Sequence, residues 1–263
     1  MLSRIQEFAN QIPDWFSGDR ATLLSKTGLW TAWVVYVGYL LLSDFPPGPS
    51  LLNTQPETLQ EAIDLSLNFW LVLPAAFPDA APVLNPAFEA LFNLVVTWGL
   101  LFWGFLIDGR NQRVPMLPFL VGTALLTNVF YLPWLALRRS HLDTPKPPFS
   151  PLEKLSESRV FPIVLLCVGL VAIAWGLWAR PEFGSINDRW DSLLTLIVSD
   201  RLAYSFVVDL LVFWVFQGWL VDDDMLRRNW DNSFIRWIAW SIPFLGLVVY
   251  FLSRPTLPET PDD

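Results

Sequence analysis

Residues 160–179 read VFPIVLLCVGLVAIAWGLWA, a stretch without a single charged side chain. A helix that crosses the hydrocarbon core of a bilayer needs about 20 mostly apolar residues. Five further stretches have the same character, at residues 27–43, 90–107, 114–137, 202–221 and 237–253, and only Asp209 interrupts an apolar run. Continuous apolar runs exclude a transmembrane barrel, whose strands would alternate. The sequence therefore predicts an all-α, polytopic transmembrane helix bundle of about six spans.

The composition supports a membrane protein and excludes several other classes. Hydrophobic residues make up 53% of the 263 residues and charged residues only 16%, against roughly 25% charged in soluble domains. The net charge is -8 and no basic arm is present, so we expect no nucleic-acid partner. A single cysteine, Cys167, and a single histidine, His141, exclude a disulfide framework and a His/Cys metal cluster within one chain.

The remaining segments divide the chain into three parts. Residues 1–26 carry acids where a signal peptide would be apolar, and they predict an N-terminal amphipathic segment on the membrane surface. Residues 27–253 form the predicted transmembrane bundle. Residues 254–263 predict a disordered acidic tail.

The longest predicted loop, residues 44–86, is acidic and contains no Lys or Arg. By the positive-inside rule this loop belongs on the non-cytoplasmic side. Within it, residues 57–73 have helical periodicity and predict an interfacial helix; the alternative is a seventh, short crossing at residues 65–81. Basic residues are almost evenly divided between the two sides of a six-span arrangement, so the orientation stays open.

Two short motifs partly resemble those of enzymes that handle diphosphates. Residues 108–113 begin like the signature of CDP-alcohol phosphotransferases, but Leu126 and Phe130 replace its two later aspartates. Residues 222–228, DDDMLRR, resemble the aspartate-rich motif of prenyl diphosphate synthases, whose spacing fails at Leu226. We interpret the first motif as a charged turn. The second is interpreted as a membrane-boundary cap, with a metal site on its aspartates as the alternative: Asp222, Asp223 and Asp224.

Polar side chains recur inside the predicted spans. Asn85, Glu89, Asn93 and Thr97 are spaced every fourth residue, which places them on one side of a helix. Asp209 lies near the middle of its span, where a carboxylate costs roughly 2.5 to 3.5 kcal/mol and should face the bundle interior. We predict that these groups converge on one polar seam of Asn85, Glu89, Asn93, Thr127, Asn128, Asp209 and Gln217.

The predicted seam has two interpretations. It could form a substrate site or a proton path, with Asp209 and Glu89 as acid or base groups, or it could be a set of interhelical hydrogen bonds that fixes packing. No Lys or Arg lies within a predicted span to pair with either acid. The sequence contains no internal repeat that we recognise, which argues against a transporter.

Several stretches are similar to an uncharacterised multi-pass membrane family of cyanobacteria and plastids. They are residues 85–94, 107–110, 132–138, 199–210 and 223–228, and the similarity extends over most of the chain from about Leu29. The resemblance implies a thylakoid or other photosynthetic membrane and brings no established activity. The spacing of Ser199, Asp209 and Asp222 is also like the C-terminal half of the plant membrane family involved in neoxanthin synthesis.

Three functional hypotheses follow. The first is a non-catalytic biogenesis, scaffold or pigment-protein accessory factor of a photosynthetic membrane, which would contact membrane lipids and a photosynthetic complex. The second is a membrane-embedded enzyme acting on a lipid or carotenoid, and the third is a small proton-coupled transporter that uses Asp209. No cofactor motif is evident, and bound lipid, chlorophyll or carotenoid is compatible with all three hypotheses.

Overall fold

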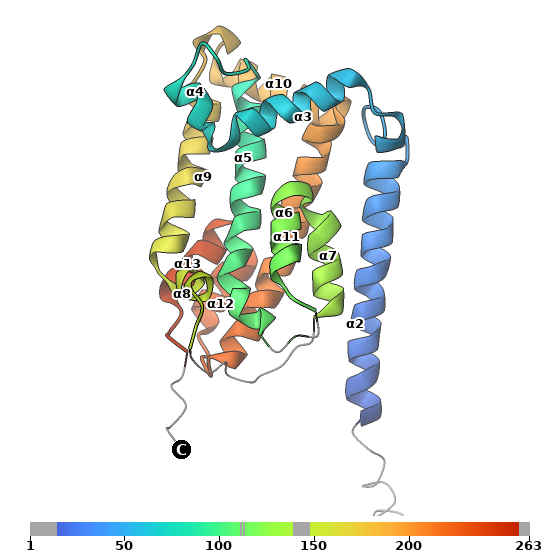
Figure 1. Ribbon diagram of the computed structural model, residues 1–263, viewed down its shortest axis with the longest axis vertical. Helices are drawn as coiled ribbons and strands as arrows, with labels where there is room; N and C mark the ends of the chain where they lie inside the picture. The colour runs from blue at the N-terminus through green and yellow to red at the C-terminus, as the bar shows by residue number, and fades with distance from the viewer. Residues whose placement is uncertain (1–14, 111, 113, 139–147, 258–263) are drawn as a thin grey trace, which may run out of the picture.

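The computed structural model describes residues 15–110, 112, 114–138 and 148–257, with backbone alone for residues 15–24. Every regular element in these ranges is a helix (Figure 1). Three of the described helices are long and apolar enough to cross a membrane, Pro86–Gly109, Val160–Trp178 and Arg201–Arg227. The prediction of an all-α protein with membrane-length helices is therefore confirmed, whereas a bundle of six spans is not.

The elements follow one another in this order: α2 (Trp15–Val35), η1 (Tyr36–Leu42), η2 (Leu51–Asn53), α3 (Pro56–Leu67), η3 (Phe69–Leu71), α4 (Val72–Ala76), α5 (Pro86–Leu101), η4 (Phe102–Gly109), α6 (Leu117–Leu126), α7 (Asn128–Leu137), α8 (Pro151–Glu157), α9 (Val160–Trp178), η5 (Pro181–Phe183), α10 (Ile186–Ser199), α11 (Arg201–Arg227), α12 (Ser233–Ser241) and α13 (Leu245–Ser253). The π-helical segment η1 continues α2, and the 3-10 segment η4 continues α5.

Four long helices stand upright in Figure 1, namely α2, α5, α9 and α11, and α3 and α10 lie across the upper end. α2 already begins at Trp15 and runs into the first predicted span, so the boundary predicted at residue 27 is not a helix end. The rest of the predicted surface segment, residues 1–14, lies outside the described residues, as does the predicted tail from residue 258.

The long acidic loop contains the predicted interfacial helix but no seventh crossing. α3 begins with Pro56, whose fixed φ suits a first helical position, and ends at Leu67. It buries Leu65 and leaves its other leucines exposed. Trp70 and Leu71 then have positive φ angles of 53° and 59°, which break the chain direction. Residues 65–81 therefore form no continuous helix, and the alternative of a seventh span is wrong.

The predicted span at residues 114–137 is a helical hairpin of two ten-residue helices, α6 and α7. The chain reverses at Thr127, whose φ is 40°. Gly122 of α6 lies against the ring of Phe130 of α7, so the absence of a side chain lets the two helices approach. Figure 1 shows both helices at the same height, with the chain entering and leaving at the lower end. Hydropathy alone does not detect this reversal, because both halves are equally apolar.

The predicted span at residues 237–253 is also divided, into α12 and α13. The reversal lies at Ile242–Phe244, where Pro243 interrupts the helix and Phe244 has a φ of 56°. Gly246 of α13 lies against the backbone of Ile238 and Ala239 in α12, as Gly122 does against Phe130 in the first hairpin.

The two halves of the chain repeat one order of elements. In each half a long helix is followed by a helix across the upper end, a second long helix and a hairpin: α2, α3, α5 and α6–α7, then α9, α10, α11 and α12–α13. An Asp–Arg ion pair closes each hairpin unit, Asp108 with Arg138 and Asp224 with Arg254, and the partners are 30 residues apart in both. The repetition thus lies in the order of the elements, and the sequence itself shows no recognisable repeat.

Candidate functional site

Asp209 lies at the centre of a buried polar cluster. Its Oδ1 accepts hydrogen bonds from the Tyr36 hydroxyl at 2.6 Å and from Asn128 Nδ2 at 2.7 Å. The Tyr36 oxygen is also 3.3 Å from Thr127 Oγ1. The side chains therefore join α11 to the start of η1 and to the tip of the first hairpin.

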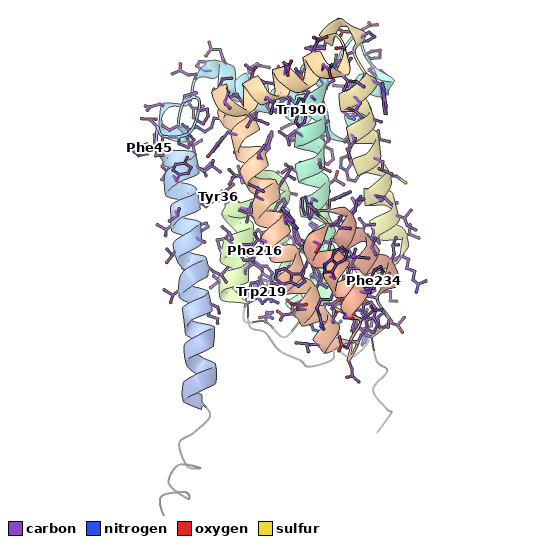
Figure 2. The ribbon with its side chains drawn as sticks, turned by 180° about the vertical axis from the view of Figure 1, so that it is seen from behind. Tyr36, Phe45, Trp190, Phe216, Trp219 and Phe234 are labelled. Atoms are coloured by element: carbon purple, nitrogen blue, oxygen red, sulfur yellow. The ribbon has the colours of Figure 1, made fainter. Side chains whose placement is uncertain are left out.

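Local backbone structure places each of these groups. Tyr36 is the first residue of η1, and in Figure 2 it lies between α2 and α11. Asn128 is the first residue of α7, so the amino end of that helix faces the carboxylate, and its backbone also hydrogen-bonds Asp209. The partial positive charge of a helix N-terminus favours a carboxylate there. The reversal at Thr127 thus places the amino end of α7 next to the Asp209 carboxylate.

A cavity of about 200 Å³ opens beside this cluster. Most of its lining is apolar, including Leu65 of α3 and Phe206 of α11. Among the described residues, Asp209 is the only acidic side chain that lines it, and the other polar contributors are hydroxyl groups of Tyr36, Ser66, Thr127 and Ser205. A cavity of about 150 Å³ holds one benzene molecule, so the space accommodates a ring or a short chain.

The cavity lies between elements of the first half of the chain and α11 of the second half. Asn128 lies at the tip of the first hairpin, ten residues before Arg138, and Phe244 lies at the tip of the second, ten residues before Arg254. The Phe244 ring packs against Trp98 of α5 and lies against Gly169 of α9. A large ring therefore occupies the space between the second hairpin, α5 and α9. Likewise, Asn93 and Asp209 each precede the ion-paired aspartate of their half by 15 residues. A carboxylate therefore stands in the second half where the first half has an amide.

The structure places Glu89 in a separate cluster near the upper end. Its carboxylate accepts hydrogen bonds from Asn68 Nδ2, from Trp175 Nε1 at 2.8 Å and from Arg180 Nε at 3.1 Å. Arg180 lies just beyond α9 and therefore outside the predicted spans. Glu89 is fully buried and ion-paired, an arrangement that fastens α9 and the upper loop to α5.

The other members of the predicted seam are also divided between different places. Asn85 caps α5 through the backbone N–H of Ala87, and Asn93 accepts from the backbone N–H of Trp70. Gln217 donates to the carbonyls of Ala239 at 2.7 Å and Ile242 at 2.9 Å, at the tip of the second hairpin. Thr127, Asn128 and Asp209 of the predicted seam meet at one point, and Glu89 and Asn93 meet at another, where both contact Asn68.

The aspartate motif belongs to an ion-pair network at the lower end. Asp223 accepts from Arg138, and Asp224 pairs with Arg227, Arg228 and Arg254. Asp108 pairs with Arg138 and Arg227. Asp222 pairs with the half-exposed Arg236. The carboxylates thus face guanidinium groups, and no cluster of His, Cys, Asp and Glu suited to a metal ion occurs within the described ranges.

Five buried carboxylates occur among the described residues, and four of them contact an arginine: Glu89, Asp108, Glu153 and Asp224. Asp209 is the fifth, at 2% exposure, and within the described part of the chain no Lys or Arg forms an ion pair with it. Neutral donors alone hold this carboxylate, which sets it apart chemically.

Sequence reasoning missed three residues of these clusters. Tyr36 lies within the apolar run at residues 27–43, and Arg180 lies one residue beyond the run at residues 160–179. Arg201 donates to the backbone carbonyls of Leu40, Ser43, Pro46 and Gly48, which fixes the end of η1 against the start of α11. Its signal in the sequence was its place directly after Asp200, the residue that caps α11. No family model, curated protein or solved structure matches the chain.

Proposed function

We propose that the protein is an integral membrane protein that binds a small, mostly apolar molecule in the Asp209 pocket, as an accessory factor of a photosynthetic membrane. One observation carries this proposal. The cavity of about 200 Å³ presents a single carboxylate, and that carboxylate is the buried one without an arginine. Ligand sites are typically apolar with a few polar groups that orient the ligand. The assignment to a photosynthetic membrane rests on the resemblance to the multi-pass membrane family of cyanobacteria and plastids, which involves residues 85–94, 107–110, 132–138, 199–210 and 223–228.

The proposal includes a topology of four crossings and two re-entrant hairpins in place of six spans. The crossings are α2 with η1, α5 with η4, α9 and α11, while α6–α7 and α12–α13 enter from one side and return to it. Non-helical backbone at membrane depth is tolerated where protein surrounds it, and the hairpin tips contact Asp209 and Gln217.

The charge distribution supports one orientation for this topology. The end where α5 and α11 finish carries most described basic residues, namely Arg110, Arg138, Lys154, Arg159, Arg227, Arg228, Arg236 and Arg254. The opposite end carries Arg180, Arg189 and Arg201 together with the acidic loop. The positive-inside rule assigns the arginine-rich end to the cytoplasm.

A second candidate function is proton-coupled transport. Discontinuous helices whose ends meet near the membrane centre, in a parallel repeat, are typical of transporters. Both hairpins have this form, and Asp209 lies where α7 begins. Catalysis on a lipid or carotenoid remains the third candidate, with Asp209 and Tyr36 as an acid or base pair.

Co-purification tests the proposed binding function. The full chain and its Asp209→Asn variant would be purified from a strain lacking the native gene, and their bound small molecules compared by mass spectrometry. We expect the unmodified chain to retain at least one species that the variant loses. Asp222→Asn is the matched control, because Asp222 is on the same helix but outside the pocket, and it should retain that species.

The same strains separate the three candidates. Accumulation of one lipid or carotenoid precursor with Asp209→Asn would support the enzyme, and a loss of proton-dependent uptake in vesicles would support the transporter. An identical set of bound molecules in all variants would contradict the binding function.

A further inference from the structure

We propose that the ligand of the Asp209 pocket is a lipophilic ammonium cation, a small amine in its protonated form with an apolar body. This inference rests on the proposed function, since it names the ligand class of the same pocket. Its first basis is the pattern of charge compensation among the buried acids.

Each of the other four buried carboxylates faces a cation that belongs to the protein. The distances between guanidinium nitrogen and carboxylate oxygen are 3.1 Å at Glu89 and 3.0 Å between Arg227 and Asp224. A buried carboxylate without an opposite charge costs several kcal/mol of stability, and in these four cases an arginine of the chain provides that charge. At Asp209 a bound cation would supply the compensation that arginine supplies elsewhere.

The pocket suits an organic cation better than a metal ion. Its volume of about 200 Å³ is far larger than a bare ion needs, and its walls are mainly aliphatic and aromatic. Asp209 supplies the single carboxylate among the described residues that line the space, whereas a hard cation requires about six oxygen ligands that converge on it.

Aromatic rings line the same space. Tyr36, Phe92 and Phe206 contribute to the walls, and the face of an aromatic ring attracts an ammonium group within about 6 Å of its centroid. An amine could thus donate a hydrogen bond to Asp209 while its apolar body contacts these rings and Leu65 of α3. Tyr36 and Asn128 Nδ2 both donate to Oδ1, which fixes the orientation of the carboxylate.

Proton binding and ammonium binding would exclude one another. Both neutralise the same carboxylate, so the ligand binds the ionised form and competes with protons. As the pH falls through the range in which Asp209 takes up a proton, the apparent Kd for the amine should rise by up to about tenfold for each unit of pH. This competition would also provide the coupling that the transporter candidate requires.

The test compares benzylammonium chloride with benzyl alcohol, which has nearly the same shape and no charge. The probes are titrated against the full chain in detergent, and Kd is taken from the rise of the thermal unfolding temperature. We expect benzylammonium to bind at least tenfold more tightly than benzyl alcohol, and sodium chloride at equal ionic strength to have no effect. Asp209→Asn should abolish the preference, whereas Asp222→Asn, which lies on the same helix outside the pocket, should retain it.

Each other outcome has a defined meaning. Equal affinity for the two benzyl probes would overturn the charge inference and leave the proposed binding function intact. Stabilisation by sodium chloride alone would overturn it in favour of an inorganic cation. Absence of binding by either probe, together with unchanged bound molecules in Asp209→Asn, would reject the proposed function itself. If Asp209→Asn fails to fold, the pH dependence of benzylammonium binding to the unmodified chain decides, and a Kd that does not change with pH would overturn the inference.

Discussion

At the scale of single residues, the Tyr36 hydroxyl is the group whose removal best isolates the Asp209 cluster. It donates to Asp209 at 2.6 Å in a buried site. Tyr36→Phe should lower the free energy of unfolding by about 1 to 3 kcal/mol, because the carboxylate loses a donor that water does not replace. Chemical denaturation in detergent measures this change.

Tyr39→Phe is the control for this prediction. Tyr39 lies one turn away on η1, and its hydroxyl pairs with that of Tyr204 at 3.2 Å in an exposed position. Its replacement should change stability by less than about 0.5 kcal/mol. Equal effects of the two replacements would show that the Tyr36 hydrogen bond does not stabilise the fold.

Glu89 and Arg180 provide a second prediction at this scale. Their side chains are 0% and 11% exposed, so Glu89→Gln leaves a buried guanidinium without its charge partner. We expect a loss of about 3 kcal/mol in the free energy of unfolding. Arg236→Gln, which removes an ion pair between half-exposed side chains, should cost less than about 1 kcal/mol. A loss at Glu89 no larger than at Arg236 would contradict a structural role for the buried pair.

Single residues also show what sequence reasoning reaches and what it misses. The expectation that Asp209 faces the interior and finds hydrogen-bond partners follows from the cost of a carboxylate in lipid, and Asn128 was among its expected neighbours. Tyr36 was not, because a tyrosine in an apolar run gives no signal of what its hydroxyl contacts. Glu89 and Arg180 are 91 residues apart in the chain, and only the packing of α9 on α5 brings them together.

At the scale of elements, the hairpin α6–α7 depends on a glycine. A Cβ atom at position 122 would overlap the ring of Phe130, so Gly122→Val should separate the two helices and move Asn128 away from Asp209. We expect a loss of about 1 to 3 kcal/mol in stability and of ligand retention as well. Gly28→Val in α2 is the control, since nothing lies within 4 Å of its added Cβ. Equal stability of the two variants would contradict close packing in the hairpin.

The helix α3 should respond to pH. Burial and the neighbouring carboxylate of Asp200 raise the pKa of Glu61 to about 7, and Asp64 adds to the shift. The folded state thus binds the proton more tightly than the unfolded chain, so the stabilising contribution is complete below about pH 4.5 and is lost as pH rises through about 7. Hydrogen exchange of α3, corrected for the intrinsic rate at each pH, should therefore accelerate between pH 5 and pH 8.

Two variants check this assignment. Glu61→Gln keeps the hydrogen-bonding shape without the titration, and it should make the exchange of α3 independent of pH over that range. Glu57→Gln, on the exposed side of the same helix, should leave the pH dependence unchanged. Because Ala62 and Leu65 of α3 line the Asp209 pocket, loosening of α3 should also widen access to it.

At the scale of the whole molecule, the repeat gives the fold two similar halves with different contents. Close packing of α9 on α5, where Gly176 lies against Ala90, and the ring of Phe244 fill one junction. At the other junction, α2 and η1 of the first half contact α11 of the second half through Tyr36 and Arg201, and the cavity lies beside these contacts. Apolar composition predicts membrane helices but does not distinguish a crossing from a hairpin, since both bury the same kinds of side chain. The reversals at Thr127 and Pro243 consequently escaped sequence reasoning.

Cysteine labelling in sealed vesicles tests this arrangement of the whole chain. The exposed Cys167 is first replaced by Ala, and single cysteines are then introduced for Asp79, Gln112, Pro148 and Glu182. If α6–α7 is a re-entrant hairpin, Gln112→Cys and Pro148→Cys react with an impermeant maleimide from the same side, and Asp79→Cys and Glu182→Cys react from the other. A six-span bundle would instead pair position 148 with 79 and position 112 with 182, because residues 114–137 would cross. Position 148 therefore decides between the two topologies. If Pro148→Cys reacts from the same side as Asp79→Cys, residues 114–137 cross the membrane and the re-entrant hairpin is rejected.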